Sequence, residues 1–162
     1  VVAALAEIGA ATGVRRPADT LRPPPAAPDG VDVAVFGAHL SGETRAGALL
    51  ALGAAPVRAI RTAPCYRMVL LAGAMARPGL VEVESGGTTV EGEVWRVPER
   101  ALPGLLAEVR RPLALGLVRL DDGTDVRGFV CAAGGEYGAP DISRFGGWRA
   151  WRTATREQES RS

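Results

Sequence analysis

The order of apolar and polar residues predicts a chain built mainly from short strands. The run VDVAVFG at 31–37 is apolar and rich in β-branched residues, which is typical of a buried strand. The stretch 56–73 is largely apolar and predicts one or two strands, interrupted at Pro64. From 90 to 97 polar and apolar residues alternate, which indicates a strand with one buried face.

Glycine-containing turns indicate two hairpins in the second half of the chain. Gly86 and Gly87 separate two strand-like runs, and both glycines tolerate the positive φ of a tight turn. The turn at 121–124 divides the apolar stretch 113–133 in the same way. Because tight turns join most neighbouring strands, the sheet is predicted to be mostly antiparallel.

Two short helices are predicted between the strands. The segment 43–54 has an apolar stripe at helical spacing and ends at Gly53. The segment 99–109 resembles a short helix that Pro103 weakens. The predicted fold class is therefore α+β: a small mixed, mostly antiparallel, β-barrel-like sheet with flanking short helices.

The N-terminal residues differ in composition from the rest of the chain. Residues 3–12 predict a short helix, and the proline-rich stretch 15–30 predicts a semi-rigid linker. We therefore expect residues 1–30 to be a helix and linker that follow another domain, and residues 31–153 to form the compact domain.

The C-terminal residues combine an aromatic cluster with a charged end. Phe145, Trp148 and Trp151 are spaced by three and predict a packing anchor. Residues 154–162 are mostly polar and are predicted to form a flexible tail.

Charge and cysteine content narrow the classes of partner. All 19 basic residues are arginine, but the net charge is +1 and the arginines are scattered among acids, so nucleic-acid binding is not predicted. The apolar runs are shorter than the roughly 18 residues of a membrane span. Cys65 and Cys131 lie far apart, which favours reduced thiols in a cytoplasmic protein over a disulfide or a zinc site.

His39 is the only histidine and lies in a glycine-rich turn after the first predicted strand. An imidazole exchanges protons near neutral pH, so His39 is a candidate general acid. A single histidine without neighbouring acids does not predict a metal site. Ser41 is two residues away, which is poor geometry for a hydrolytic triad. The alternative interpretation is a structural histidine in a loop.

Tyr66 and Arg67 are further candidates because they follow a proline that restrains the chain. A guanidinium can hold a carboxylate through two hydrogen bonds. The alternative is a strand with a solvated arginine.

Five segments in order along the chain resemble the C-terminal domain of allophanate hydrolase, over about residues 31–152. They are VFGAHLSG, RTAPCYRM, VEGEVWRVPE, DGTDVRGFVC and DISRFGGWRAW. This domain is similar in fold to gamma-glutamylcyclotransferases, which bind substrate carboxylates at the loop after the first strand. The resemblance also implies that an amidase domain precedes this one in the parent chain. The expected assembly of the parent enzyme is a homodimer.

The resemblance implies a step of urea degradation: decarboxylation of N-carboxycarbamate to carbamate and carbon dioxide, without a cofactor or metal. In this interpretation His39 is the general acid. The predicted substrate-binding residues are Gly37, Ala38, Leu40, Ser41, Tyr66 and Arg67.

The sequence departs from the relatives at two positions. The catalytic acid of the cyclotransferases falls at about Val109, next to Glu108 but not on it, and Ala132 stands where a carboxylate is expected after GFVC. Two alternative functions stay open. One is a non-catalytic assembly or small-dicarboxylate-binding module, and the other is a gamma-glutamylcyclotransferase-like enzyme.

Overall fold

The computed structural model describes residues 29–162. The predicted helix at 3–12 and most of the predicted linker lie outside the described residues. Seven strands form a five-stranded sheet and a separate two-stranded ribbon. The strands are β1 (Val31–Val35), β2 (Ala55–Arg61), β3 (Tyr66–Leu71), β4 (Arg77–Glu82), β5 (Glu91–Val97), β6 (Leu113–Arg119) and β7 (Asp125–Cys131).

The five-stranded sheet has the order β2-β5-β1-β7-β6, so the first strand of the described chain is also its central strand. β1 pairs with β5 antiparallel and with β7 parallel. β6 and β7 form the hairpin that the turn at 121–124 predicts, with Gly123 at φ 83°. A mixed, mostly antiparallel sheet is therefore confirmed, but the strands described do not close into a barrel.

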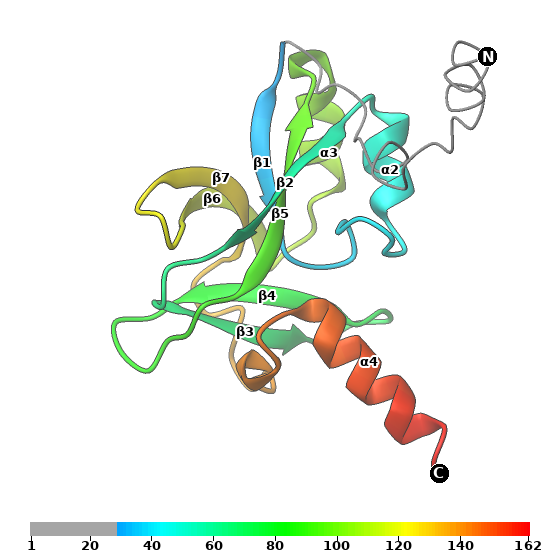
Figure 1. Cartoon of the computed structure of the whole chain (residues 1–162), viewed down its shortest axis with the longest axis vertical. Coiled ribbons are helices and arrows are strands. Elements are labelled where there is room, and N and C mark those ends of the chain that lie inside the picture. The colour runs from blue at the N-terminus through cyan, green and yellow to red at the C-terminus, as the bar shows by residue number, and fades with distance from the viewer. Residues whose placement is uncertain (1–28) are drawn as a thin grey trace, which may run out of the picture.

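The ribbon of β3 and β4 runs across one end of the five-stranded sheet (Figure 1). The predicted hairpin around Gly86 and Gly87 is wrong, because β4 pairs with β3 and β5 pairs with β1 and β2. The glycines do form a turn, but it packs against the start of β3. A Cβ on Gly87 would lie 2.7 Å from the backbone of Cys65, and Thr88 N–H donates to the carbonyl of Tyr66.

Three α-helices connect or end the strands. They are α2 (Ala46–Ala51), α3 (Leu102–Glu108) and α4 (Trp148–Glu159), with short 3₁₀ turns at Glu99–Ala101 (η2) and Ser143–Phe145 (η3). Pro103 lies in the first turn of α3, where a proline costs no helical hydrogen bond, so it begins the helix rather than weakening it. α4 continues through Glu159, so residues 154–159 are helical rather than an irregular tail.

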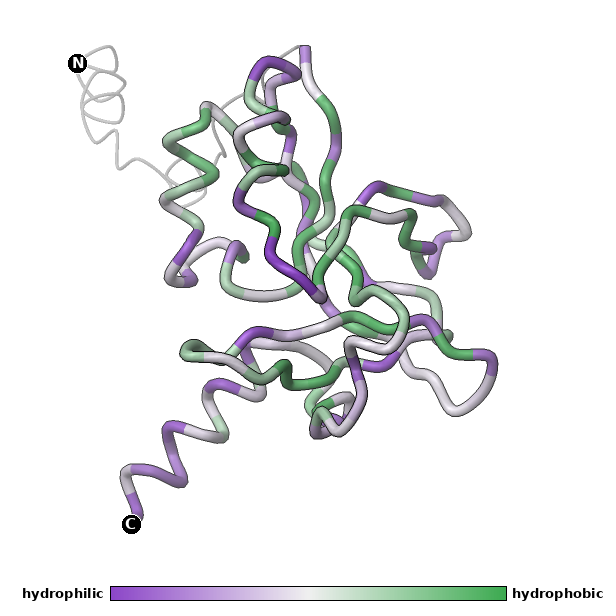
Figure 2. Tube along the Cα trace, turned by 180° about the vertical axis from the view of Figure 1, so that it is seen from behind, coloured by the Kyte–Doolittle hydropathy of each residue, from purple (hydrophilic) through white to green (hydrophobic). Residues whose placement is uncertain are grey.

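Apolar side chains from the sheet, the ribbon and the helices share one core. Trp95, Tyr66, Leu49 and Met68 are among its largest fully buried members. Trp148 is only 3% exposed and its ring stacks on that of Trp151 at 4.7 Å, which confirms the predicted aromatic anchor. Figure 2 shows apolar residues gathered along the strands, while the end of α4 projects from the body with mostly hydrophilic residues.

Candidate functional site

The loop between β1 and α2 is held in shape by its own backbone. Leu40 N–H donates to the carbonyl of Gly37 at 2.9 Å, and Arg45 N–H donates to the carbonyl of Ala38 at 2.8 Å. Ser41 N–H donates to the Glu93 carboxylate at 2.8 Å. These bonds fold the loop back on itself and hold His39 beside the end of the central strand.

Gly37 lets this loop pass directly against the ribbon. A Cβ at this position would lie 2.4 Å from Cγ of Pro78 in β4, closer than carbon atoms can approach. The residue must therefore be glycine for the loop and the ribbon to keep their contact.

We expect Gly37→Ala to destabilise the fold by about 1–3 kcal/mol, since the new methyl group must push the loop off Pro78. Gly47→Ala is the matched control, because a Cβ on Gly47 in α2 meets nothing within 4 Å. That control should stabilise by up to about 1 kcal/mol, because alanine is the better helix former. Urea unfolding of both variants checks the pair, and equal stabilities would contradict the packing argument.

A cavity of about 90 Å³ opens beside His39, between the loop, the ribbon, α3 and β7. Since one water fills about 10–15 Å³ by this measure, the cavity accommodates a molecule with a handful of non-hydrogen atoms. Most of its wall is apolar. The apolar side chains include Val35, Phe36, Leu80, Leu105, Leu113 and Phe129.

The imidazole of His39 packs beside the Phe129 ring of β7, with the ring centroids 6.0 Å apart and an interplanar angle of 27°. Its Nε2 is buried and has no hydrogen-bond partner among residues 29–162. An unsatisfied buried polar atom is costly and uncommon in a folded protein, so it calls for a functional explanation.

The charge state of His39 follows from its surroundings. Burial first, and then the positive charge of Arg45, lower the pKa of His39 below its usual value of 6.5, while Glu108 acts in the opposite direction. The imidazole of the free protein is therefore neutral at neutral pH. A perturbed pKa in a cavity is a common mark of a functional site.

The charged side chains of the cavity are mostly cationic. Arg45, Arg77 and Arg110 line it together with a single acid, Glu108. Glu108 lies 3.8 Å from Arg45, and both side chains are about half exposed. Arg77 and Arg110 have no ion-pair partner within 4.0 Å in the part of the chain that the structure describes. The cavity thus offers two guanidinium groups to an anion.

The predicted loop residues divide into two groups. Gly37, Ala38 and His39 line the cavity. Leu40 is 2% exposed and belongs to the core, and the backbone and hydroxyl of Ser41 both donate to Glu93 rather than into the cavity. The amide of Leu40 donates within the loop and that of Ser41 donates to Glu93 of β5, whereas the amides of Ala38 and His39 have no such partner among the residues described.

Tyr66 and Arg67 do not line this cavity. Tyr66 is 1% exposed, and its hydroxyl accepts a hydrogen bond from Arg119 N–H at 2.9 Å. Burial raises the pKa of that hydroxyl. The side chain of Arg67 lies on the opposite, exposed face of the strand, 3.9 Å from Asp141, and donates to the carbonyl of Gly86 at 3.3 Å. The structure therefore does not bring these two residues to His39.

Sequence reasoning missed the three arginines of the cavity. In a chain whose basic residues are all arginine, no single arginine stands out. For Glu108 one signal was present: the resemblance to the cyclotransferases predicts a catalytic acid at about Val109, and both Val109 and Glu108 line the cavity. Ala132 does not line it; its N–H donates to the carbonyl of Pro112.

Two features are absent from the part of the chain that the structure describes. No group of three or more His, Cys, Asp or Glu side chains within 29–162 is arranged to hold a metal ion. None of the helices described is long and apolar enough to cross a membrane.

Fold and site together define a small α+β domain with a cavity at the end of its central strand that is lined by three arginines and one glutamate. The sequence model described as allophanate hydrolase C-terminal domain matches residues 31–153. The chain belongs to this family.

The chain spans only a small part of the yeast relatives that it matches, but almost the whole of one bacterial protein. Urea amidolyase of Saccharomyces cerevisiae is 32% identical over 135 residues, which cover 80% of this chain and 7% of that protein. The structure of Kluyveromyces lactis allophanate hydrolase superposes with a TM-score of 0.74 at 32% identity, covering 78% of this chain and 22% of that one. A uropathogenic E. coli-specific protein superposes with a TM-score of 0.70 at 29% identity, and the match covers 76% of this chain and 95% of that one.

Proposed function

We propose that this domain decarboxylates N-carboxycarbamate to carbamate and carbon dioxide, with His39 as the general acid. The observation that carries the proposal is a partly buried imidazole whose buried Nε2 has no partner among residues 29–162, in a cavity with three arginines and one glutamate. Membership in the allophanate hydrolase C-terminal domain family supports a role in urea degradation.

The charge of the cavity suits this substrate. With His39 neutral, three arginines against one glutamate leave an excess of two positive charges. N-carboxycarbamate carries two carboxylates on one nitrogen. We assign one carboxylate to Arg77 and Arg110 and the other to the free amides of Ala38 and His39. The apolar side chains of the wall lower the polarity around the ligand, which strengthens these electrostatic interactions.

In the proposed reaction the bond between nitrogen and one carboxylate carbon breaks. The departing carboxylate becomes carbon dioxide, and the electron pair of the broken bond goes to nitrogen. Protonated His39 donates its proton to that nitrogen, so carbamate leaves with an NH₂ group. His39 is left neutral, and it takes up a proton from solvent when the next substrate binds. Proton donation by a positioned acid typically contributes about 10² to 10⁴-fold in rate.

The neutral imidazole of the free domain acquires its proton when the substrate binds. A dianion beside His39 favours the imidazolium, because opposite charges stabilise each other in a cavity of low polarity. The pKa of His39 therefore rises on binding, and one proton is taken up. The acid is charged only when there is a substrate to receive its proton.

Titration with malonate tests the proposal, because malonate is a stable dicarboxylate with CH₂ in place of NH. We expect malonate to raise the pKa of His39 and to bind more tightly as the pH falls through that raised value. The chain has one histidine, so a single imidazole resonance in the NMR spectrum follows the titration. Saturable binding that leaves this resonance and its titration unchanged would overturn the site assignment.

A cyclotransferase activity has one supporting observation, the Glu108 carboxylate in the cavity. Its pairing with Arg45 at 3.8 Å leaves it poorly disposed to act as a free base. Turnover of a gamma-glutamyl amine that disappears in Glu108→Gln would favour this alternative. Malonate binding without any acceleration of decarboxylation would favour a binding module.

A further inference from the structure

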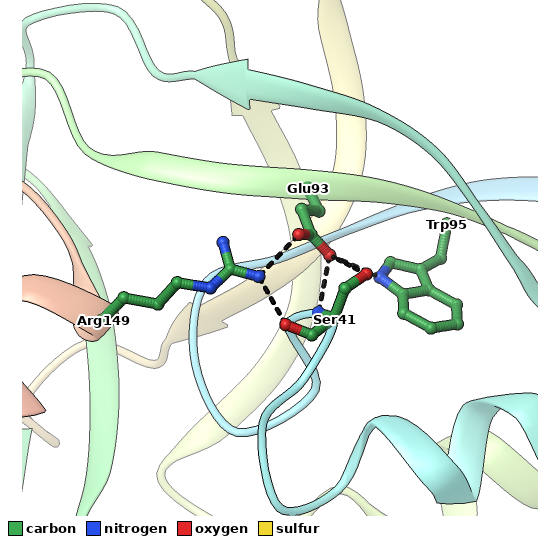
Figure 3. A network of polar contacts seen from close by, with 4 residues as sticks. All are labelled: Ser41, Glu93, Trp95 and Arg149. Carbon is green, nitrogen blue, oxygen red and sulfur yellow. Dashed lines mark hydrogen bonds and ion pairs between the residues drawn. The ribbon is translucent and has the colours of Figure 1, made fainter. Parts of the chain in front are cut away.

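Two arginines of α4 reach the loop that carries His39. A single Nη atom of Arg149 donates to the Glu93 carboxylate and to the carbonyl of Ser41, both at 2.7 Å (Figure 3). Arg152, one turn further along α4, donates to the Glu43 carboxylate at 2.6 Å. The C-terminal helix is thus tied to both Ser41 and Glu43, two and four residues after His39.

Glu93 of β5 is at the centre of these contacts. Its Oε2 accepts hydrogen bonds from Ser41 N–H and Ser41 Oγ, each at 2.8 Å, and from Trp95 Nε1 at 3.2 Å. Its other oxygen accepts from Arg149. The acceptor capacity of the carboxylate is almost filled by side chains and backbone from three parts of the fold.

The carboxylates in these contacts are more buried than those of ordinary surface ion pairs, while the Arg149 side chain is 48% exposed. The side chain of Glu93 is 13% exposed and that of Glu43 is 14% exposed. Burial pushes the pKa of Glu93 upward, but hydrogen bonds from Arg149 and Ser41 outweigh it and hold that pKa below its usual 4.5. Removing one partner of such a pair leaves a buried charge uncompensated, which is costly.

The imidazole depends on this framework for its position. Its Nε2 has no hydrogen bond within 29–162, so the ring is oriented by its backbone and by packing against Phe129. The backbone on its C-terminal side is fixed at Ser41 by Glu93 and Arg149. A loss of this fixation moves the ring in the cavity.

We propose that Glu93 of β5 and Arg149 of α4 are positioning residues for His39. Neither residue lines the cavity, so α4 sets the geometry of the site through Arg149 from outside it. The inference rests on the proposed role of His39 in ligand binding and proton transfer. Neither Glu93 nor Arg149 touches the substrate in this proposal. They act through Ser41 on the loop.

Arg149→Met tests the inference, with Arg156→Met as the matched control. Arg156 is on the same helix and has no ion-pair partner within 4.0 Å among the residues described. We expect Arg149→Met to weaken malonate binding about tenfold and to slow decarboxylation by about 10 to 100-fold, since misplacement of about 1 Å has effects of this size. Arg156→Met should change neither.

The resonance of the single histidine separates positioning from general stability. In Arg149→Met the ring loses part of its burial, so the pKa of His39 should rise toward 6.5 in the free protein. The charged groups that face the ring, Arg45 in the loop, Arg77 in β4, and Glu108 and Arg110 at the end of α3, are unchanged in this variant. A folded Arg149→Met protein with unchanged His39 titration and malonate affinity would overturn the proposal.

Arg149→Lys provides the rescue. Because one nitrogen of Arg149 makes both contacts, a lysine ammonium can donate to Glu93 and Ser41 in its place. We expect it to restore most of the His39 titration and malonate affinity, and a lysine variant no better than methionine would contradict the hydrogen-bond argument. These readouts do not require turnover, so failure to decarboxylate would reject the proposed reaction while leaving the positioning test intact.

Discussion

His39→Gln slows carbon dioxide release from N-carboxycarbamate by about 10² to 10⁴-fold, the usual contribution of a general acid, and leaves the fold intact. Glutamine keeps a polar side chain of similar reach but cannot donate a proton as an acid. His39 is only partly buried and its Nε2 makes no hydrogen bond that folding would lose among residues 29–162. Catalysis should therefore suffer far more than stability.

The measurement generates the substrate in place, because N-carboxycarbamate decomposes spontaneously. A separate amidase releases it from allophanate, and carbon dioxide is followed with and without this domain. The spontaneous rate is the baseline, and thermal unfolding verifies the fold of the variant. Equal rates for the native domain and His39→Gln, both above the baseline, would show that His39 is not the general acid. If both rates equalled the baseline, the proposed decarboxylase activity itself would be rejected.

Arg77→Met should weaken malonate binding by about 10 to 100-fold, since hydrogen bonds to charged groups contribute about 1.5–3 kcal/mol each. Arg77 begins β4, lines the cavity, and has no carboxylate within 4.0 Å among the residues described. Its positive charge is therefore open to a ligand. Methionine keeps much of the apolar stem, so the loss reports the guanidinium rather than the packing.

Arg127→Met is the control for the Arg77 experiment. Arg127 is on β7, is exposed and does not line the cavity. Arg127→Met changes the net charge of the domain by the same amount as Arg77→Met. Calorimetric titration of both variants at one salt concentration separates a local contact from the general attraction of a cationic surface. Equal losses in the two variants would contradict a specific carboxylate contact at Arg77.

Local sequence signals predicted the strands and one hairpin well. The apolar run before His39 became β1, and Gly123 closed the turn between β6 and β7. The turn at Gly86 and Gly87 led to a wrong hairpin prediction, because a turn signal does not determine which strand the chain pairs with next. β5 found its partners in β1 and β2, which are distant in sequence, and pairing at such a distance leaves no local mark.

The site was predictable only where it is local. Gly37, Ala38 and His39 follow one another and line the cavity as expected from one loop. Tyr66 and Arg67 do not line the cavity. Successive side chains of a strand point to opposite faces, so Tyr66 is buried in the core and Arg67 is exposed. The guanidinium groups come from the loop, from β4 and from the end of α3, and only the fold brings them together.

The wide spacing of the cavity residues has a consequence for the folding of this domain. The wall combines residues 35–45, 77–80, 105–113 and 129, and the loop is fixed by Arg149 of α4. Because a domain folds as a unit, no one of these segments forms the cavity alone. Malonate binding is therefore an assay of the assembled fold, and unfolding that separates these segments should abolish it.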